Sequence, residues 1–213
     1  MAWHNKTYGA YGRTSTEAYE NALQIYGVLH SRGWTLEAVS GMLGNVEAES
    51  GYNPWRWEGD NVLNQGNPRI SFSTTNGYGL CQWTPPGKYI YNASGYSGYG
   101  PNYSDSVGSS YDGNAQMLYL DENADYFKNP AHPEYWIPYD EYKHASISDY
   151  SIDFLAHAWF WNFERGTWFP SRVAAAEYWY TTLGGVVPPT PPTPQGRIPI
   201  WLMFKLKEGK GFV

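Results

Sequence analysis

Two glutamates, Glu47 and Glu49, lie two positions apart in GMLGNVEAESGYNP, residues 41–54. A carboxyl group that stays protonated near neutral pH can act as a general acid. On a helical wheel, Glu49 falls on the same side as Met42 and Val46, whereas Glu47 falls roughly 140° from Met42. Glu49 therefore faces the apolar stripe, where lost solvation favours the protonated form. We predict that Glu49 is a general acid and Glu47 an ordinary solvated side chain; the alternative is that Glu49 only hydrogen-bonds a loop at the helix end.

Helical patterns must position this glutamate. A capping box of Thr14 and Glu17 predicts a first helix over about residues 15–32, and Thr35 and Gly51 bound a second helix that carries Glu49. Apolar periodicity returns at 115–127, 146–163 and 170–184, whereas turn-forming residues predict long loops at 52–76 and 92–114. The pattern indicates a mainly α domain with long loops and at most a small β-hairpin or sheet.

Composition narrows the function. The chain has 213 residues, 42% of them hydrophobic, which is enough for one main domain. A net charge of -6 argues against binding to nucleic acid or to an anionic membrane by charge alone. The 11 Trp, 20 Tyr and 8 Phe exceed what packing usually requires, so they favour either carbohydrate binding or an aromatic core.

Two motifs and a closing segment resemble a known family. ESGYNPWRW (49–57) followed by GYGLCQWTPPGKY (77–89) resembles the lysozyme-like fold of soluble lytic transglycosylases and goose-type lysozymes. The closer likeness is to the phage tail lysozyme family, the peptidoglycan-degrading domain of tail-tip and tail-knob proteins. FERG (163–166) and AEYWY (176–180) match that family's closing segment. The resemblance covers about residues 15–185 and implies a lysozyme-like (α+β) domain.

The resemblance also implies a reaction. It implies hydrolysis of the β-1,4 bond between N-acetylmuramic acid and N-acetylglucosamine by a glycosidase, or muramidase, in which Glu49 protonates the leaving oxygen and Ser50 orients its carboxyl group. Gly79, Leu80 and Gln82 would form a turn beside the cleft, and the Gln82 amide would hold the sugar. The rings expected to stack on the sugar, or else to pack in the core, are Trp57, Tyr78 and Trp83.

A second carboxylate decides the outcome of glycoside cleavage. Glu58 and Asp60 in the following loop are the candidates, although each can equally be a solvated charge. If neither serves, the enzyme would resemble lytic transglycosylases, which form 1,6-anhydro products. A non-catalytic peptidoglycan-binding module is the remaining alternative. For Glu164 and Arg165 of FERG, we expect an ion pair that braces the last helix.

The sequence gives little support for a catalytic cysteine or a bound metal ion. Cys81 lies beside Gln82, but none of the three downstream histidines, His132, His144 and His157, has a recognisable surrounding motif. Close-set ligand patterns such as H-E-x-x-H are missing from the sequence. We therefore predict no metal and no cofactor.

The chain divides at a proline-rich tract. We expect an N-terminal arm (1–9), a catalytic domain (10–185), a Pro/Thr-rich linker (186–195) and a C-terminal stub (196–213) of a longer protein. The N-terminus lacks the apolar stretch of a signal peptide, and no segment is long enough to span a membrane. The expected location is a virion tail or comparable particle, with bacterial peptidoglycan and tail or injection-apparatus proteins as partners in cell wall lysis.

Overall fold

The computed structural model describes residues 3–4, 10–58, 76–84, 89 and 112–188. Its helical elements are α1 (Thr16–His30), α2 (Leu36–Ser50), α4 (Asp112–Asn123), the 3-10 turn η3 (Pro133–Tyr135), α5 (Tyr139–Lys143), α6 (Ile152–Trp159), the π-helical turn η4 (Phe160–Glu164) and α7 (Ser171–Leu183). Isolated antiparallel bridges join Tyr78 to Trp57 and to Trp83. The prediction of a mainly α domain with at most a small β element is confirmed.

The helix starts depend on which hydroxyl reaches a free backbone N–H group. Thr35 caps α2 as predicted, because its Oγ1 accepts from the N–H of Ala38 at 3.2 Å. The prediction of Thr14 as the first cap is wrong: Ser15 Oγ accepts from the N–H of Ala18 at 3.1 Å. The helix expected from residue 146 begins only after Ser151, which caps α6 in the same way.

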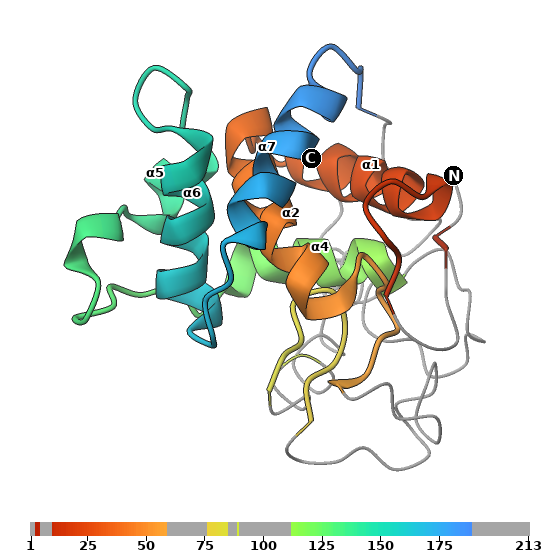
Figure 1. Ribbon diagram of the computed structural model, residues 1–213, viewed down its shortest axis with the longest axis horizontal. Coiled ribbons are helices and arrows are strands. Elements are labelled where there is room, and N and C mark those ends of the chain that lie inside the picture. The colour runs from red at the N-terminus through yellow and green to blue at the C-terminus, as the bar shows by residue number, and fades with distance from the viewer. Residues whose placement is uncertain (1–2, 5–9, 59–75, 85–88, 90–111, 189–213) are drawn as a thin grey trace, which may run out of the picture.

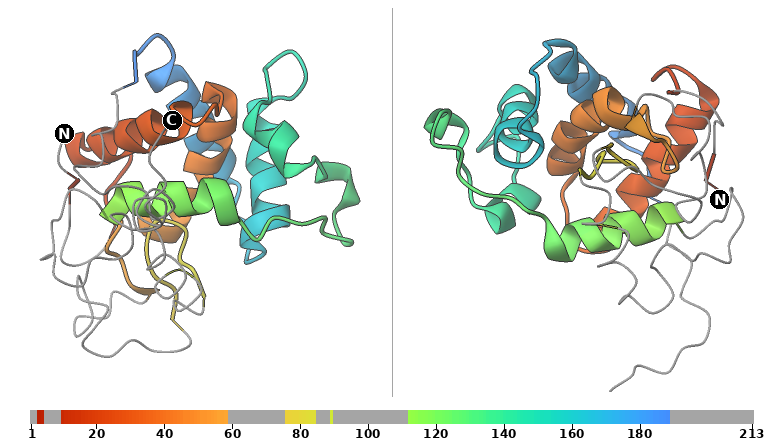
Figure 2. Two further views of the ribbon diagram at one scale, coloured as in Figure 1. Left: turned by 180° about the vertical axis from the view of Figure 1, so that it is seen from behind. Right: turned by 90° about the horizontal axis from the view of Figure 1, so that it is seen from below.

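Helix α2 lies between the other long helices of the domain. Figure 1 and the two views of Figure 2 place α1 on one side of α2 and α6 on the other, with α7 alongside it. Two glycines permit this close approach. A Cβ atom at Gly41 would lie 2.8 Å from Leu155 Cβ on α6, and one at Gly44 would lie 2.2 Å from the carbonyl oxygen of Arg172 on α7. The sequence of α2 thus fixes the position of both neighbouring helices.

Much of the aromatic surplus is buried. Trp34 packs edge-on against Tyr142 and Trp159, with ring centroids 6.1 and 6.0 Å apart. Trp179 Nε1 donates to Tyr52 Oη at 2.6 Å, which joins α7 to the turn after α2. These aromatic residues therefore form a core, which is one of the two uses that composition left open.

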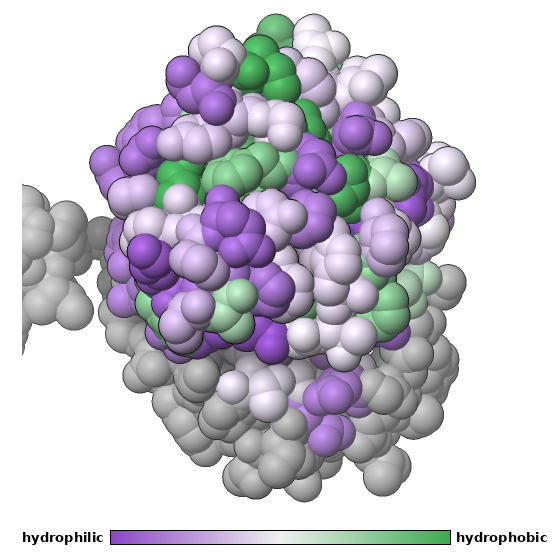
Figure 3. Space-filling view, turned by 60° about the vertical axis from the view of Figure 1, so that its left-hand side comes forward, coloured by the Kyte–Doolittle hydropathy of each residue, from purple (hydrophilic) through white to green (hydrophobic). Residues whose placement is uncertain are grey.

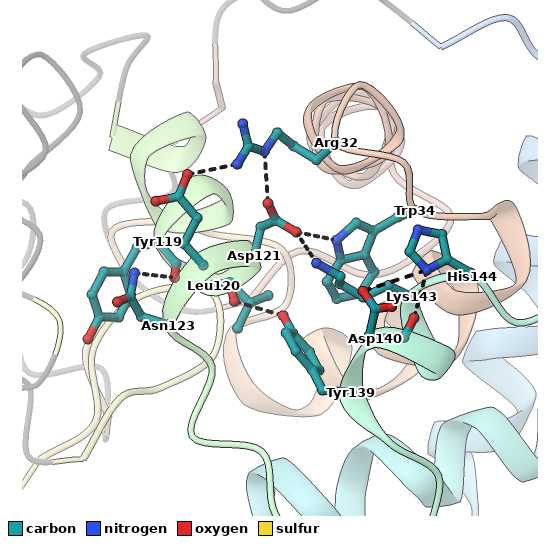
Figure 4. Close-up of polar contacts among 11 residues, drawn as sticks. Arg32, Trp34, Tyr119, Leu120, Asp121, Asn123, Tyr139, Asp140, Lys143 and His144 are labelled. Atoms are coloured by element: carbon teal, nitrogen blue, oxygen red, sulfur yellow. Dashed lines mark hydrogen bonds and ion pairs between the residues drawn. The ribbon is translucent and has the colours of Figure 1, made fainter. Parts of the chain in front are cut away.

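One buried carboxylate connects three helices (Figure 4). Asp121 on α4 accepts from Trp34 Nε1 at 2.8 Å, from Arg32 Nε at 2.8 Å and from Lys143 Nζ at 3.0 Å. Burial would raise the pKa of Asp121, but these hydrogen bonds and the charge of Lys143 outweigh it and hold the pKa below its usual value. Asp121 therefore binds the end of α1 and the end of α5 to α4.

Asp121→Asn is expected to lower the free energy of unfolding by about 1–2 kcal/mol at pH 7. Asn keeps an acceptor for Trp34, but the carboxylate that pairs with Lys143 is lost, and Arg32 keeps only its pair with Glu122. The folded-state pKa lies below the unfolded value, so the stabilisation is present above about pH 4 and is lost as the pH falls further. Urea unfolding at pH 7 and pH 3 measures this, and a difference between the proteins that does not shrink at pH 3 contradicts the assignment.

The surface and termini add little to the site. Figure 3 shows hydrophobic residues as separate areas among hydrophilic ones on one face of the domain. Trp3 is buried and donates from Nε1 to Asn114 Oδ1 at 3.1 Å, so part of the expected arm packs on the domain. Most of the predicted linker and all of the predicted stub lie outside the described residues. Among the described helices, none is both long and apolar enough to cross a membrane.

Candidate active site

A cavity of about 540 Å³ lies where the end of α2, the bridged loop and the turn η4 meet. Glu49 lines it from α2 and Glu164 from η4. Its other charged lining residues, in the part of the chain that the structure describes, are Arg56, Glu58, Asp125 and Arg165. A cavity of this size accepts a small ligand or one part of a polymer.

Glu49 lies in the last turn of α2 and lines the cavity. The helix ends at Gly51, whose φ of 55° is left-handed and whose N–H group donates to the carbonyl oxygens of Val46 and Glu47. The Glu49 side chain is 21% exposed. The helix end therefore places this carboxyl group at the wall of the cavity, where the side chain is partly buried.

Arg172, in the first turn of α7, contacts Glu49 from the protein side. Its Nη2 donates to Glu49 Oε1 at 2.7 Å, and its Nη1 donates to Asn45 Oδ1 at 3.1 Å. The Arg172 side chain is only 4% exposed, and its guanidinium carbon lies 4.8 Å from the centre of the Phe160 ring. A buried guanidinium with a carboxylate partner fixes that carboxylate in one orientation.

Glu164, at the end of η4, is the second carboxyl group of the cavity. Its Oε1 accepts from Trp159 Nε1 at 3.1 Å. Burial first, and then the charge of Glu49, raise the pKa of Glu164 well above its usual value, although Trp159, Arg172 and Arg165 act in the opposite direction. Glu164 consequently favours its protonated form.

The expected ion pair that braces the last helix is wrong, because neither Glu164 nor Arg165 forms an ion pair with α7. Arg165 has a left-handed φ of 59°, and its Nη2 donates to the carboxylate of Asp125 at 3.2 Å. The turn η4 thus directs the two neighbouring side chains to different partners: Glu164 accepts from Trp159, and Arg165 pairs with Asp125.

The description of Glu47 as an ordinary solvated side chain is also wrong. Glu47 Oε1 accepts from Arg13 Nη2 and its Oε2 from Tyr52 Oη, both at 2.7 Å. Its side chain is 23% exposed, almost the same as that of Glu49. The two glutamates of α2 therefore differ in partners rather than in exposure, and only Glu49 lines the cavity.

The three rings expected to stack on a sugar have different positions. Trp57 and Tyr78 are buried and pack on each other with ring centroids 4.7 Å apart, so they stabilise the bridged loop from the protein interior. Trp83 lines the cavity and stacks on Tyr89 at 4.7 Å. Trp83 is also largely buried, at 8% exposure, but it is the one of the three that lines the cavity, so it alone has a position suited to the expected role.

The remaining motif residues shape the loop. Ser50 is buried, and its hydroxyl donates to the carbonyl oxygen of Val46 at 3.2 Å, so it does not have the expected contact with Glu49. Gly79 has a φ of 82°, and a Cβ there would lie 2.6 Å from Gln116 Oε1. Gln82 lines the cavity, but its Nε2 donates to the carbonyl oxygens of Arg56 and Gly79. The Gln82 amide therefore holds the loop together.

Of the two expected second carboxylates, one can be described. Glu58 lines the cavity, and its Oε2 accepts from the N–H group of Gly77 at 2.7 Å. Asp60 lies outside the described residues.

The buried thiol of Cys81 also lines the cavity. Burial, followed by the charges of Glu164 and Glu49, raises the pKa of Cys81 well above its usual value. A neutral thiol is a poor nucleophile, so the environment of Cys81 does not favour cysteine-peptidase chemistry. Within the described ranges, no cluster of three or more His, Cys, Asp or Glu side chains is arranged to hold a metal ion.

Comparison with known proteins finds a matching protein family and a related phage protein. The sequence profile of the phage tail lysozyme family matches residues 20–183, which include Glu49, Gln82, Glu164 and Arg172. The chain is 34% identical over 174 residues to morphogenesis protein 1 of Bacillus phage B103. That match covers 78% of this chain and 40% of the phage B103 protein, so the chain spans about two fifths of that relative's length.

Proposed function

Because the chain belongs to the phage tail lysozyme family, we propose that it cleaves the glycan strands of bacterial peptidoglycan, with Glu49 as the general acid. The bond is the β-1,4 linkage between N-acetylmuramic acid and N-acetylglucosamine. The single observation that carries the proposal is that Glu49 lines a cavity of about 540 Å³ while Arg172 holds one oxygen of its carboxyl group.

In the proposed reaction, the proton lies on the Glu49 oxygen that Arg172 does not contact. As the bond between the anomeric carbon and the leaving oxygen breaks, this proton passes to that oxygen. Positive charge then develops on the sugar, and the carboxylates of the cavity stabilise it. Fixing Glu49 at a helix end matters because proton donation requires the acid within hydrogen-bond reach of the leaving oxygen.

After the glycosidic bond breaks, the anomeric carbon can be attacked in two ways. In a hydrolase, a carboxylate activates water or forms a covalent intermediate. In a lytic transglycosylase, the 6-hydroxyl of the substrate attacks and a 1,6-anhydro product forms. Transglycosylation is worth testing because it needs no second carboxylate. Glu58, the candidate for that role among the described residues, already accepts a hydrogen bond from the backbone of Gly77. Hydrolysis is our first proposal and transglycosylation the second.

We test the proposal by digesting purified sacculi and resolving the soluble products by mass spectrometry. Glycan fragments with reducing ends support the hydrolase, and fragments lighter by one water support the transglycosylase. Peptide fragments without glycan cleavage contradict both. If the protein sediments with sacculi but releases no fragments at any pH, the chain is a peptidoglycan-binding module and not an enzyme. From the family we also propose that the protein is located in the virion tail and contacts other tail proteins. Immunodetection on purified virions tests the location.

A further inference from the structure

A buried asparagine in α2 contacts the arginine that holds Glu49. Asn45 lies one helical turn before Glu49 and is fully buried. Its Oδ1 accepts from Arg172 Nη1 at 3.1 Å, and its backbone carbonyl oxygen accepts from the same nitrogen at 3.4 Å. The other terminal nitrogen of Arg172, Nη2, donates to Glu49 Oε1 at 2.7 Å. One guanidinium therefore joins the Asn45 amide to the carboxyl group of Glu49.

The hydrogen bonds of the Asn45 amide are satisfied in only one orientation. Its Nδ2 donates to the carbonyl oxygen of Gly41 at 3.0 Å and to that of Ala156 on α6 at 3.1 Å. Both N–H bonds of the amide are thus used, and Oδ1 is left to face the cation. A flipped amide would direct N–H groups at Arg172 and an oxygen at two carbonyl oxygens. Asparagine fits this position because a short amide offers two donors to the backbone and one acceptor to the guanidinium.

The guanidinium of Arg172 depends on these contacts for its direction. Its guanidinium carbon lies 4.8 Å from the centre of the Phe160 ring and 6.0 Å from that of Phe169. Such ring contacts depend little on where the N–H bonds point, whereas hydrogen bonds depend strongly on it. Among the described residues, the guanidinium forms hydrogen bonds with Asn45 and Glu49 alone, and its Nε has no partner. Asn45 therefore determines how the guanidinium is turned toward Glu49.

We propose that Asn45 is a positioning residue that acts through Arg172: it turns the guanidinium so that Nη2 holds one oxygen of Glu49 and leaves the other oxygen to the glycan. The inference rests on the proposed function of Glu49. Because Asn45 also binds the carbonyl oxygen of Ala156, the acid is tied to α6 and α7 as well as to its own helix. A misplacement of a catalytic group by about 1 Å can lower a rate by about 10²-fold.

The test is a double-variant cycle in kcat for glycan release, with Asn45→Ala and Arg172→Lys made singly and together. Asn45→Ala should lower kcat by about 10–100-fold and leave KM within about threefold, since Asn45 is not among the residues that line the cavity. Lysine keeps a positive charge beside Glu49 but lacks the forked guanidinium. If Asn45 acts through Arg172, the double variant should be slower than Arg172→Lys by no more than about twofold. Losses that multiply would overturn the inference.

Asn21→Ala is the matched control. Asn21, on α1, is also fully buried, and its Nδ2 donates to the carbonyl oxygens of His4 and Tyr52. Its Oδ1 accepts from the backbone N–H group of His4 instead of a cation. The melting temperature should fall in both alanine variants, but Asn21→Ala should keep kcat within about threefold of the wild type. Equal losses of kcat in the two variants would reduce the role of Asn45 to stability.

Nitrogen-15 NMR of arginine side chains in the wild type decides the matter if Asn45→Ala does not fold. A guanidinium held at both terminal nitrogens rotates slowly about its Nε–Cζ bond. Arg172 should therefore give separate Nη resonances, and a single averaged resonance would contradict the inference. If the wild type releases no glycan at any pH, the proposed function fails, while the NMR measurement still shows whether the guanidinium is fixed between Asn45 and Glu49.

Discussion

Glu49→Gln is expected to lower kcat for glycan cleavage on the order of 10³-fold, because a positioned general acid contributes about 10²–10⁴-fold and an amide cannot replace it. Gln still offers an oxygen to Arg172 Nη2, so the buried guanidinium keeps an acceptor and the domain should stay folded. Initial rates of product release from sacculi measure the effect, and sedimentation with sacculi should show binding within a few-fold of the wild type.

The matched control is Glu47→Gln. It makes the same change two residues earlier in α2, at a side chain with a similar exposed fraction that contacts Arg13 and Tyr52 instead of the cavity. Its rate should stay within about threefold of the wild type, because the control lacks any contact with the reacting bond. Equal losses in the two variants would mean that the charge of α2, and not the acid at position 49, determines the rate.

Gly44→Val is expected to lower the free energy of unfolding by about 3 kcal/mol or more, because no room exists for its side chain. A Cβ at this position would lie 2.2 Å from the carbonyl oxygen of Arg172 and 2.9 Å from Ala176 Cβ. The melting temperature should fall by roughly 6–12 °C for a domain of this size. Moving α7 also moves Arg172 away from Glu49, so we expect activity to fall by about 10²-fold at a temperature where the variant is folded.

Gly12→Val serves as the control, since a Cβ at Gly12 meets nothing within 4 Å. Its melting temperature and rate should stay close to those of the wild type. Glycan release by Gly44→Val at the wild-type rate would show that the contact between α2 and α7 does not position the acid.

The sequence was informative where a signal is local. The caps at Thr35 and Gly51 and the apolar spacing of α2 predict a helix that ends beside Glu49, and that helix is present. The motif around Glu49 carried the family resemblance, which the profile match confirms. Local hydrogen bonding and side-chain periodicity determine these features, so a short stretch of sequence contains them.

The rest of the site depends on contacts between distant residues. Arg172 lies 123 positions from Glu49 and has no motif of its own, and its contact depends on the close approach of α7 to Gly44. For Glu164 and Arg165 the sequence predicted an ion pair that braces the last helix, but the π-helical turn directs Glu164 to Trp159 and Arg165 to Asp125. Composition could not separate a buried Trp57 from a cavity-lining Trp83. Glu164 and Glu49 line the same cavity only because the helices pack together, and no local pattern in the sequence encodes that arrangement.

The most direct test of the central claim is a crystal structure of Glu49→Gln with a bound tetrasaccharide of alternating N-acetylglucosamine and N-acetylmuramic acid. The account predicts that the sugar occupies the cavity between α2 and η4, with the glycosidic oxygen about 3 Å from the side chain at position 49. Sugar bound elsewhere, or a glycosidic oxygen out of hydrogen-bond reach of that side chain, would contradict the assignment of Glu49 as the acid.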